Sequence, residues 1–105
     1  MNNNLENKLK ELKKGYLKKL EVILSGLKNM VENLEQLNIT ELYSQVHTIS
    51  GTSGMYELSD LSDISVDFEI YLKPIKENPD LINIEELKDK FSNYLNSIEI
   101  VLLGD

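Results

Sequence analysis

Hydrophobic residues along this chain recur mainly at intervals of three or four, the spacing that places them on one face of an α-helix. The sequence contains four such segments and no comparable alternation of apolar and polar residues between turn signals, as a strand would have. Gly15 interrupts the first segment at a cost of about 1 kcal/mol to a helix. We therefore expect a long first helix that is bent or split near Gly15. Its apolar positions are Leu5, Leu9, Leu12, Tyr16, Leu20, Ile23, Leu27, Met30 or Val31, and Leu34.

Three further helices are each marked by a start signal. Asn38 or Thr40 is expected to cap the second helix and Ser59 the third, because their side-chain oxygens can accept hydrogen bonds from exposed amides of the first turn. Asn83, with Glu86 three residues later, has the spacing of a capping box and opens the fourth helix.

Each of these three helices has one apolar face. The expected core positions are Leu42, Val46, Ile49, Ser53 and Tyr56 in the second helix, Leu61, Ile64, Phe68, Tyr71 and Ile75 in the third, and Ile84, Leu87, Phe91, Tyr94 or Leu95, Ile98, and Val101 or Leu102 in the fourth. Pro74 and Pro79 are expected to end the third helix, because proline lacks a backbone donor. The fourth helix is expected to end near Gly104.

Short connections and inward-facing apolar stripes predict an all-α fold, an antiparallel up-and-down four-helix bundle. The alternative is that the first helix forms a coiled-coil arm. Its stripe mixes Tyr, Ile and Met without sustained heptads, which favours the bundle. The stripe is too long to stay exposed on a monomer, so we expect it to be packed. The length of 105 residues suits a single domain over residues 1–105.

Composition restricts the classes of function. The chain contains no Cys and one His, which excludes disulfides, thiolate nucleophiles and zinc–cysteine sites. A net charge of −7 argues against a general nucleic-acid binder, which would cluster positive charge against phosphates. No apolar run suits a signal peptide or a membrane-spanning helix. We therefore expect a cytoplasmic protein without membrane insertion.

Two charged clusters are expected to be solvated helix faces. Asp60, Asp63 and Asp67 recur along one helical strip but lack the spacing of a calcium loop, so no metal site is predicted. The lysines of residues 8–19 are interspersed with acidic residues such as Glu11, which favours an ordinary helix surface over a membrane-binding patch.

The second helix contains an unusual segment, His47-Thr48-Ile49-Ser50-Gly51-Thr52-Ser53-Gly54. Two glycines inside a helix cost roughly 1 kcal/mol each, so a local reason is expected. At about 100° per residue, His47 lies roughly 135° from the centre of the apolar face and should point into solvent. Gly51 and Gly54 follow one and two turns later on the same side, where bare backbone lets a partner or ligand approach the imidazole. The alternative is a solvated surface histidine beside a glycine-rich loop.

The segment Val46–Tyr56, together with Leu58 and Leu61, resembles a histidine-containing phosphotransfer (HPt) domain. The pattern of that family is a His, an aliphatic residue two positions later, a Gly four positions after the His, a run of small residues, a hydrophobic pair and a leucine-led helix. The matching positions are His47, Ile49, Gly51, Thr52-Ser53-Gly54, Met55-Tyr56, Leu58 and Leu61. The family fold, a four-helix bundle, agrees with the helical pattern of the whole chain.

Two positions depart from the family pattern. Ser50 stands three residues after His47, where the family frequently has a Lys that could neutralise a phosphoryl group. A hydroxyl can donate a hydrogen bond to phosphate but supplies no charge. Glu57 stands ten residues after the His, where the family often has Gly. These departures affect the expected lifetime of a phosphorylated state and the turn into the third helix.

The resemblance implies a phosphocarrier without independent catalysis. A phosphoryl group would pass from the aspartate of a response-regulator receiver domain to His47, and from there to another receiver. The ring nitrogen distal to the backbone is the implied acceptor. The receiver would supply the Mg²⁺, so no cofactor is expected in this chain. A sensor histidine kinase is an alternative donor, and the chain could be free-standing or part of a longer kinase.

The residues around His47 are expected to assist docking. Ser50 is the expected hydrogen-bond donor to phosphate, and Gly51 and Gly54 are expected to provide clearance for the partner. The remaining candidates on the exposed side are Tyr43, Ser44 and Thr48, with Tyr43 equally compatible with the rim of the core. The alternative function is a helical interaction domain of the same fold that binds a signalling partner without phosphotransfer.

Overall fold

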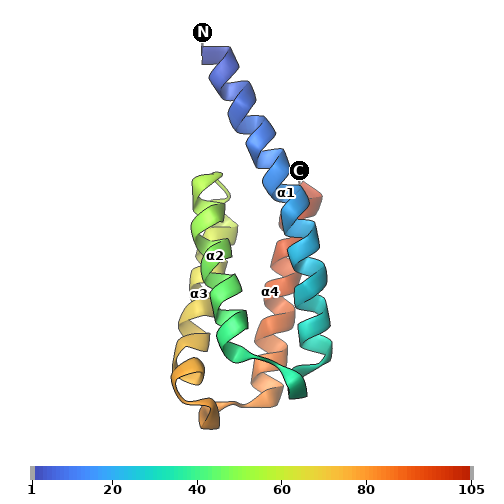
Figure 1. Cartoon of the computed structure of the whole chain (residues 1–105), viewed down its shortest axis with the longest axis vertical. Helices are drawn as coiled ribbons and strands as arrows, with labels where there is room; N and C mark the ends of the chain where they lie inside the picture. The colour runs from blue at the N-terminus through green and yellow to red at the C-terminus, as the bar shows by residue number, and fades with distance from the viewer. Residues whose placement is uncertain (1, 105) are drawn as a thin grey trace.

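The computed structural model describes residues 2–104, and all regular secondary structure within this range is helical. The elements in chain order are α1 (Asn2–Glu32), the 3₁₀ turn η1 (Leu34–Gln36), α2 (Ile39–Met55), α3 (Ser59–Glu77), the 3₁₀ turn η2 (Pro79–Leu81) and α4 (Ile84–Gly104). The long helices lie alongside one another, with α2 next to α3 and α1 next to α4 (Figure 1). The predicted all-α class is confirmed for the described range.

The core lies between the helices and is contributed by all four. It consists of Tyr16, Leu20, Leu24, Leu27, Ile39, Leu42, Val46, Ile49, Leu61, Phe68, Leu72, Ile75, Leu87, Phe91, Tyr94, Leu95 and Ile98. Two expected core positions are exposed, Ile64 and Ile84. On α3 the interior position beside Ile64 is taken by Ser65, which is fully buried because its hydroxyl has a partner on α4.

The first helix is continuous, so it does not split at Gly15. A methyl group added at Gly15 would meet no atom within 4 Å, so no neighbouring group displaces the backbone there. The expectation that the whole stripe of α1 is packed is wrong for its first turns, since Leu5, Leu9 and Leu12 are exposed. These turns extend past the ends of the other helices (Figure 1), and burial of the stripe begins at Tyr16.

Two of the predicted helix starts are confirmed. The side-chain oxygen of Asn38 accepts a hydrogen bond from the amide of Glu41 at 3.1 Å. Asn83 does the same for Glu86 at 3.1 Å. Both satisfy an amide that would otherwise lack a helical partner.

The predicted cap at Ser59 is wrong. Ser59 is the first residue of α3, and Leu58 precedes it without any side-chain cap. The tight connection from α2 uses backbone groups instead, with the Leu58 amide donating to the Ser53 carbonyl at 2.9 Å. Glu57 lies in this connection with a φ of 62°, a left-handed conformation that favours glycine.

The end of α3 was also predicted incorrectly at Pro74. This residue lies inside the helix, which continues to Glu77. A proline near the end of a helix removes one hydrogen bond, and the buried Leu72 and Ile75 on either side hold the last turn in place. Pro79 acts as predicted, because Asn78 before it is extended, with φ −141° and ψ 92°.

Buried hydroxyl groups are paired across the helices. The hydroxyls of Tyr16 on α1 and Ser53 on α2 lie 3.2 Å apart, and those of Ser65 on α3 and Tyr94 on α4 lie 2.8 Å apart. Burial raises the pKa of Tyr16 and Tyr94 above the ordinary value of 10.0. Burial therefore favours the protonated form of both phenols.

We predict that alkaline pH destabilises the fold through these phenols. The unfolded chain releases the tyrosine protons near pH 10, whereas the raised pKa of Tyr94 keeps its proton in the folded state. The folded state then binds more protons, so the free energy of unfolding is undiminished below about pH 10 and falls as pH rises further. Urea titrations above about pH 10 should show that the free energy of unfolding falls less steeply with pH for Tyr94→Phe than for the wild type. Equal slopes of the free energy of unfolding against pH would contradict the role assigned to Tyr94.

Candidate functional site

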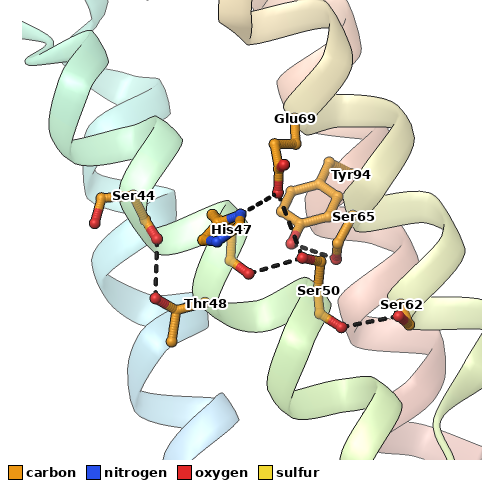
Figure 2. Close-up of polar contacts among 8 residues, drawn as sticks. All are labelled: Ser44, His47, Thr48, Ser50, Ser62, Ser65, Glu69 and Tyr94. Atoms are coloured by element: carbon orange, nitrogen blue, oxygen red, sulfur yellow. Dashed lines mark hydrogen bonds and ion pairs between the residues drawn. The ribbon is translucent and has the colours of Figure 1, made fainter.

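His47 lies on the solvent side of α2, as predicted. Its neighbours Val46 and Ile49 are buried, and the helical rotation from Val46 carries the imidazole away from the core. The side chain of His47 is 69% exposed. Figure 2 shows the imidazole between α2 and α3, directed toward Glu69.

Glu69 on α3 contacts the ring of His47. Its Oε1 lies 2.9 Å from Nδ1 of the imidazole, and only 19% of the Glu69 side chain is exposed. A carboxylate can only accept a hydrogen bond, so this contact requires a proton on Nδ1. In the neutral ring that leaves the lone pair on Nε2, which has no partner among residues 2–104. The arrangement therefore orients the imidazole and favours the tautomer with its proton on Nδ1.

Ser50 does not occupy the exposed position predicted for it. Its side chain is buried, and its Oγ donates to the His47 carbonyl at 2.7 Å and lies 3.4 Å from Oε1 of Glu69. Its own carbonyl accepts a hydrogen bond of 2.8 Å from Ser62 on α3. The reason is the close packing of α2 on α3 through small residues, which covers a side of α2 expected to face solvent. Ser50 thus joins the two helices beside His47 (Figure 2).

Tyr43 lies one turn before His47 and is half-buried. Its ring stacks parallel to the imidazole, with ring centroids 6.3 Å apart and an interplanar angle of 7°. The ammonium group of Lys76 on α3 lies 4.4 Å from the centre of the Tyr43 ring, within the range of a cation–π contact. A positive charge therefore lies over the Tyr43 ring, on the helix that also carries Glu69.

The two glycines differ in their surroundings. A methyl group added at Gly51 would meet no atom within 4 Å, so the expected open space beside His47 is present there. At Gly54 it would lie 3.5 Å from the Ser62 hydroxyl, which is ordinary contact. Gly54 thus lies closer to α3 than predicted, and Gly51 is the position with free access.

Ser44 and Thr48 are exposed beside His47, as expected. The hydroxyl of Thr48 donates to the Ser44 carbonyl at 3.0 Å, a bond within α2. Both side chains therefore belong to the surface around the imidazole, and neither contacts the ring.

Glu69 was missed by the sequence analysis. It lies 22 residues from His47, outside the segment that carries the resemblance. A signal did exist, because Leu58 in the connection between the helices lies 11 residues from each of them. When two neighbouring helices are joined by a short turn, residues equally distant from the turn come to lie side by side.

Two further questions raised by the sequence concern metal binding and membrane-spanning helices. Among residues 2–104, no three His, Asp or Glu side chains come together in a way that could hold a metal ion, and this includes the carboxylates of Asp60, Asp63 and Asp67. No helix within the same range combines the length and apolar character needed to cross a membrane.

In three comparisons with known proteins, no family model, no curated protein and no solved structure matches this chain.

We predict that Glu69 holds the neutral ring of His47 with its proton on Nδ1. His47 is the only histidine in the chain, so ¹⁵N NMR of the imidazole reads this site without ambiguity. The wild type should show a protonated Nδ1 and an unprotonated Nε2 when the ring is neutral. Glu69→Ala should shift the ring toward the Nε2-protonated tautomer that predominates in free histidine, whereas Asp67→Ala, an exposed carboxylate on the same helix, should not. An unchanged tautomer in Glu69→Ala would refute the role of the contact.

Proposed function

We propose that this chain is a histidine phosphocarrier of the HPt type, an antiparallel up-and-down bundle in which His47 accepts and passes on a phosphoryl group. The observation that carries the proposal is the contact of 2.9 Å between Glu69 and Nδ1 of an exposed imidazole. An exposed ring with one nitrogen held by a carboxylate and the other directed to solvent suits a nucleophile that must reach into a partner.

The geometry suits nucleophilic attack by Nε2. In the proposed transfer, its lone pair attacks the phosphorus of an acyl phosphate on the receiver aspartate. A P–N bond forms, the P–O bond to the aspartate breaks, and the aspartate leaves as a carboxylate. The ring becomes positively charged, and its Nδ1–H continues to donate a hydrogen bond to Glu69. The negative charge of Glu69 stabilises the charged ring of the product. The same steps in reverse pass the group to a second receiver.

Charge stabilisation at the site is divided between the two proteins. Phosphoryl transfer depends mainly on positioning and on neutralising the charge of the transferred group. Ser50 supplies no charge, and its hydroxyl is already bonded to the His47 carbonyl, so we assign it to the packing of α2 on α3 and not to phosphate binding. Lys76, whose ammonium group contacts the Tyr43 ring one turn from His47, is a candidate cation on this chain for that compensation. The receiver would supply the Mg²⁺.

Docking would use the open surface of α2 around His47. Gly51 leaves space for the backbone or side chains of a partner, and Ser44 and Thr48 flank the ring. The partner is a receiver domain, with a sensor histidine kinase as the alternative donor. The chain then acts as a carrier without catalysis of its own, in the cytoplasm where such receivers operate.

The proposal predicts phosphorylation of His47 by a receiver domain. The protein is mixed with a panel of receivers charged by a small phosphodonor, and its intact mass is followed. The wild type should gain one phosphoryl group that is labile to acid and stable to alkali, and His47→Ala should gain none. Glu69→Ala should slow the transfer roughly 10- to 100-fold, the range seen when the carboxylate that orients a metal-bound histidine is lost, with Asp67→Ala as the matched control.

Absence of transfer from every receiver and from histidine kinases, with the fold intact, would reject the phosphocarrier. Receiver binding by a wild-type protein that accepts no phosphoryl group would instead identify the interaction domain of the same fold.

We predict separately that Gly51→Leu blocks the transfer without unfolding the protein. Gly51 lies in open space, so a leucine there costs the isolated fold little but fills the approach to His47. Gly26→Leu is the matched control, because Gly26 is also in open space inside a helix but lies on α1. The measurements are thermal unfolding and transfer rate for both variants. Unchanged transfer in Gly51→Leu would contradict the role assigned to this space.

A further inference from the structure

A separate surface of the molecule is left uncovered at the start of α1. Residues 4–15, which we call the α1 extension, project beyond the ends of α2 and α4 (Figure 1). Leu5, Leu9 and Leu12 in this extension are 63%, 53% and 55% exposed. They continue the stripe that becomes buried at Tyr16, and a row of exposed apolar side chains on one helix face is a candidate interaction surface.

The α1 extension forms one wall of an open groove. Leu9, Lys10 and Lys13 line one side, and the residues from Met55 to Glu57, at the end of α2, line the other. The volume of the groove is about 250 Å³. Met55 is largely exposed and adds to the apolar surface beside Leu9. The groove therefore offers an apolar strip with charged edges, which suits an amphipathic helix.

We propose that a second copy of this chain covers this surface, with the two α1 extensions packed antiparallel. Leu5, Leu9, Leu12 and Tyr16 are spaced by four, three and four residues, the spacing of the inward a and d positions of a coiled coil. The spacing changes at Leu20, where α1 is already inside its own bundle. In an antiparallel pair, Leu9 of each copy packs against Leu12 of the other.

The charges beside this stripe select the antiparallel orientation. In the same register Glu6 and Lys13 occupy e positions, and Lys8 occupies a g position. A parallel pair places g against e of the partner helix, which sets Lys8 against Lys13 of the second copy on both sides. An antiparallel pair places e against e, which sets Glu6 of each copy near Lys13 of the other, with both contacts on the same side of the interface. Only the antiparallel pair joins opposite charges.

The expected dimer is weak. Three leucines and Met55 per copy make a small interface, whereas stable complexes bury roughly 1,200–2,000 Å². The site around His47 does not depend on this interface, since its partners are on α2 and α3.

Sedimentation of the wild-type protein over a wide concentration range tests the proposal. The mean mass should rise from the 12.1 kDa of one chain toward twice that value as concentration increases. Leu9→Glu should keep the mass at that of one chain, and it replaces a side chain outside the core, so circular dichroism should report an unchanged helix content. Val22→Glu is the matched control, because Val22 is 74% exposed on the same helix but lies outside the stripe. This control should associate as the wild type does.

Charge reversal tests the orientation. Glu6→Lys alone and Lys13→Glu alone should each weaken association, by roughly tenfold in the dissociation constant, and the double variant should restore it. In a parallel pair Lys13→Glu would instead strengthen association, by removing the repulsion from Lys8. A wild type that stays monomeric at every concentration, or a dimer unaffected by Leu9→Glu, would overturn the proposal.

Discussion

The close packing of α2 against α3 is the constraint on which the rest of the site depends. Small side chains on both helices, among them Ser50 and Ser62, let the two backbones approach, and their hydroxyls replace the hydrogen bonds that burial removes. This proximity is what brings a carboxylate of α3 to the imidazole of α2. A larger residue at either serine would separate the two helices. The carboxylate of Glu69 would then move away from the imidazole of His47.

The helical framework was largely predictable because its signals are local. Asn38 and Asn83 cap helices through contacts within three residues, so the sequence around each is sufficient. The cap of α3 was mispredicted because the connection before it is closed by a backbone hydrogen bond from Leu58 to Ser53, which gives no side-chain signal. The continuation of α3 through Pro74 depends on apolar residues packed against other helices, which a local rule does not include.

The candidate site was predictable only for the residues of one helix. The exposure of His47 and the space at Gly51 follow from helical rotation and from the absence of a side chain. The burial of Ser50 and the contact with Glu69 depend on which side of α2 meets α3, and hence on how closely two helices approach. Helical periodicity assigns an angle to each residue but not the depth to which a neighbouring helix covers it.

The packing of α1, which is mainly against α4, has a consequence for the local motions of the molecule. Since α1 packs mainly on α4 while α2 packs on α3, fraying at the start of α1 breaks few contacts with the hairpin that carries His47. The amides of residues 4–15, before the first buried position at Tyr16, should therefore exchange with solvent through small openings, while those around Ser50 exchange only when the hairpin opens. Tyr16 marks the boundary, because it is the first residue of α1 bonded to α2, through Ser53. One short chain thus combines a helical segment that opens readily with a hairpin that holds the site in a fixed geometry.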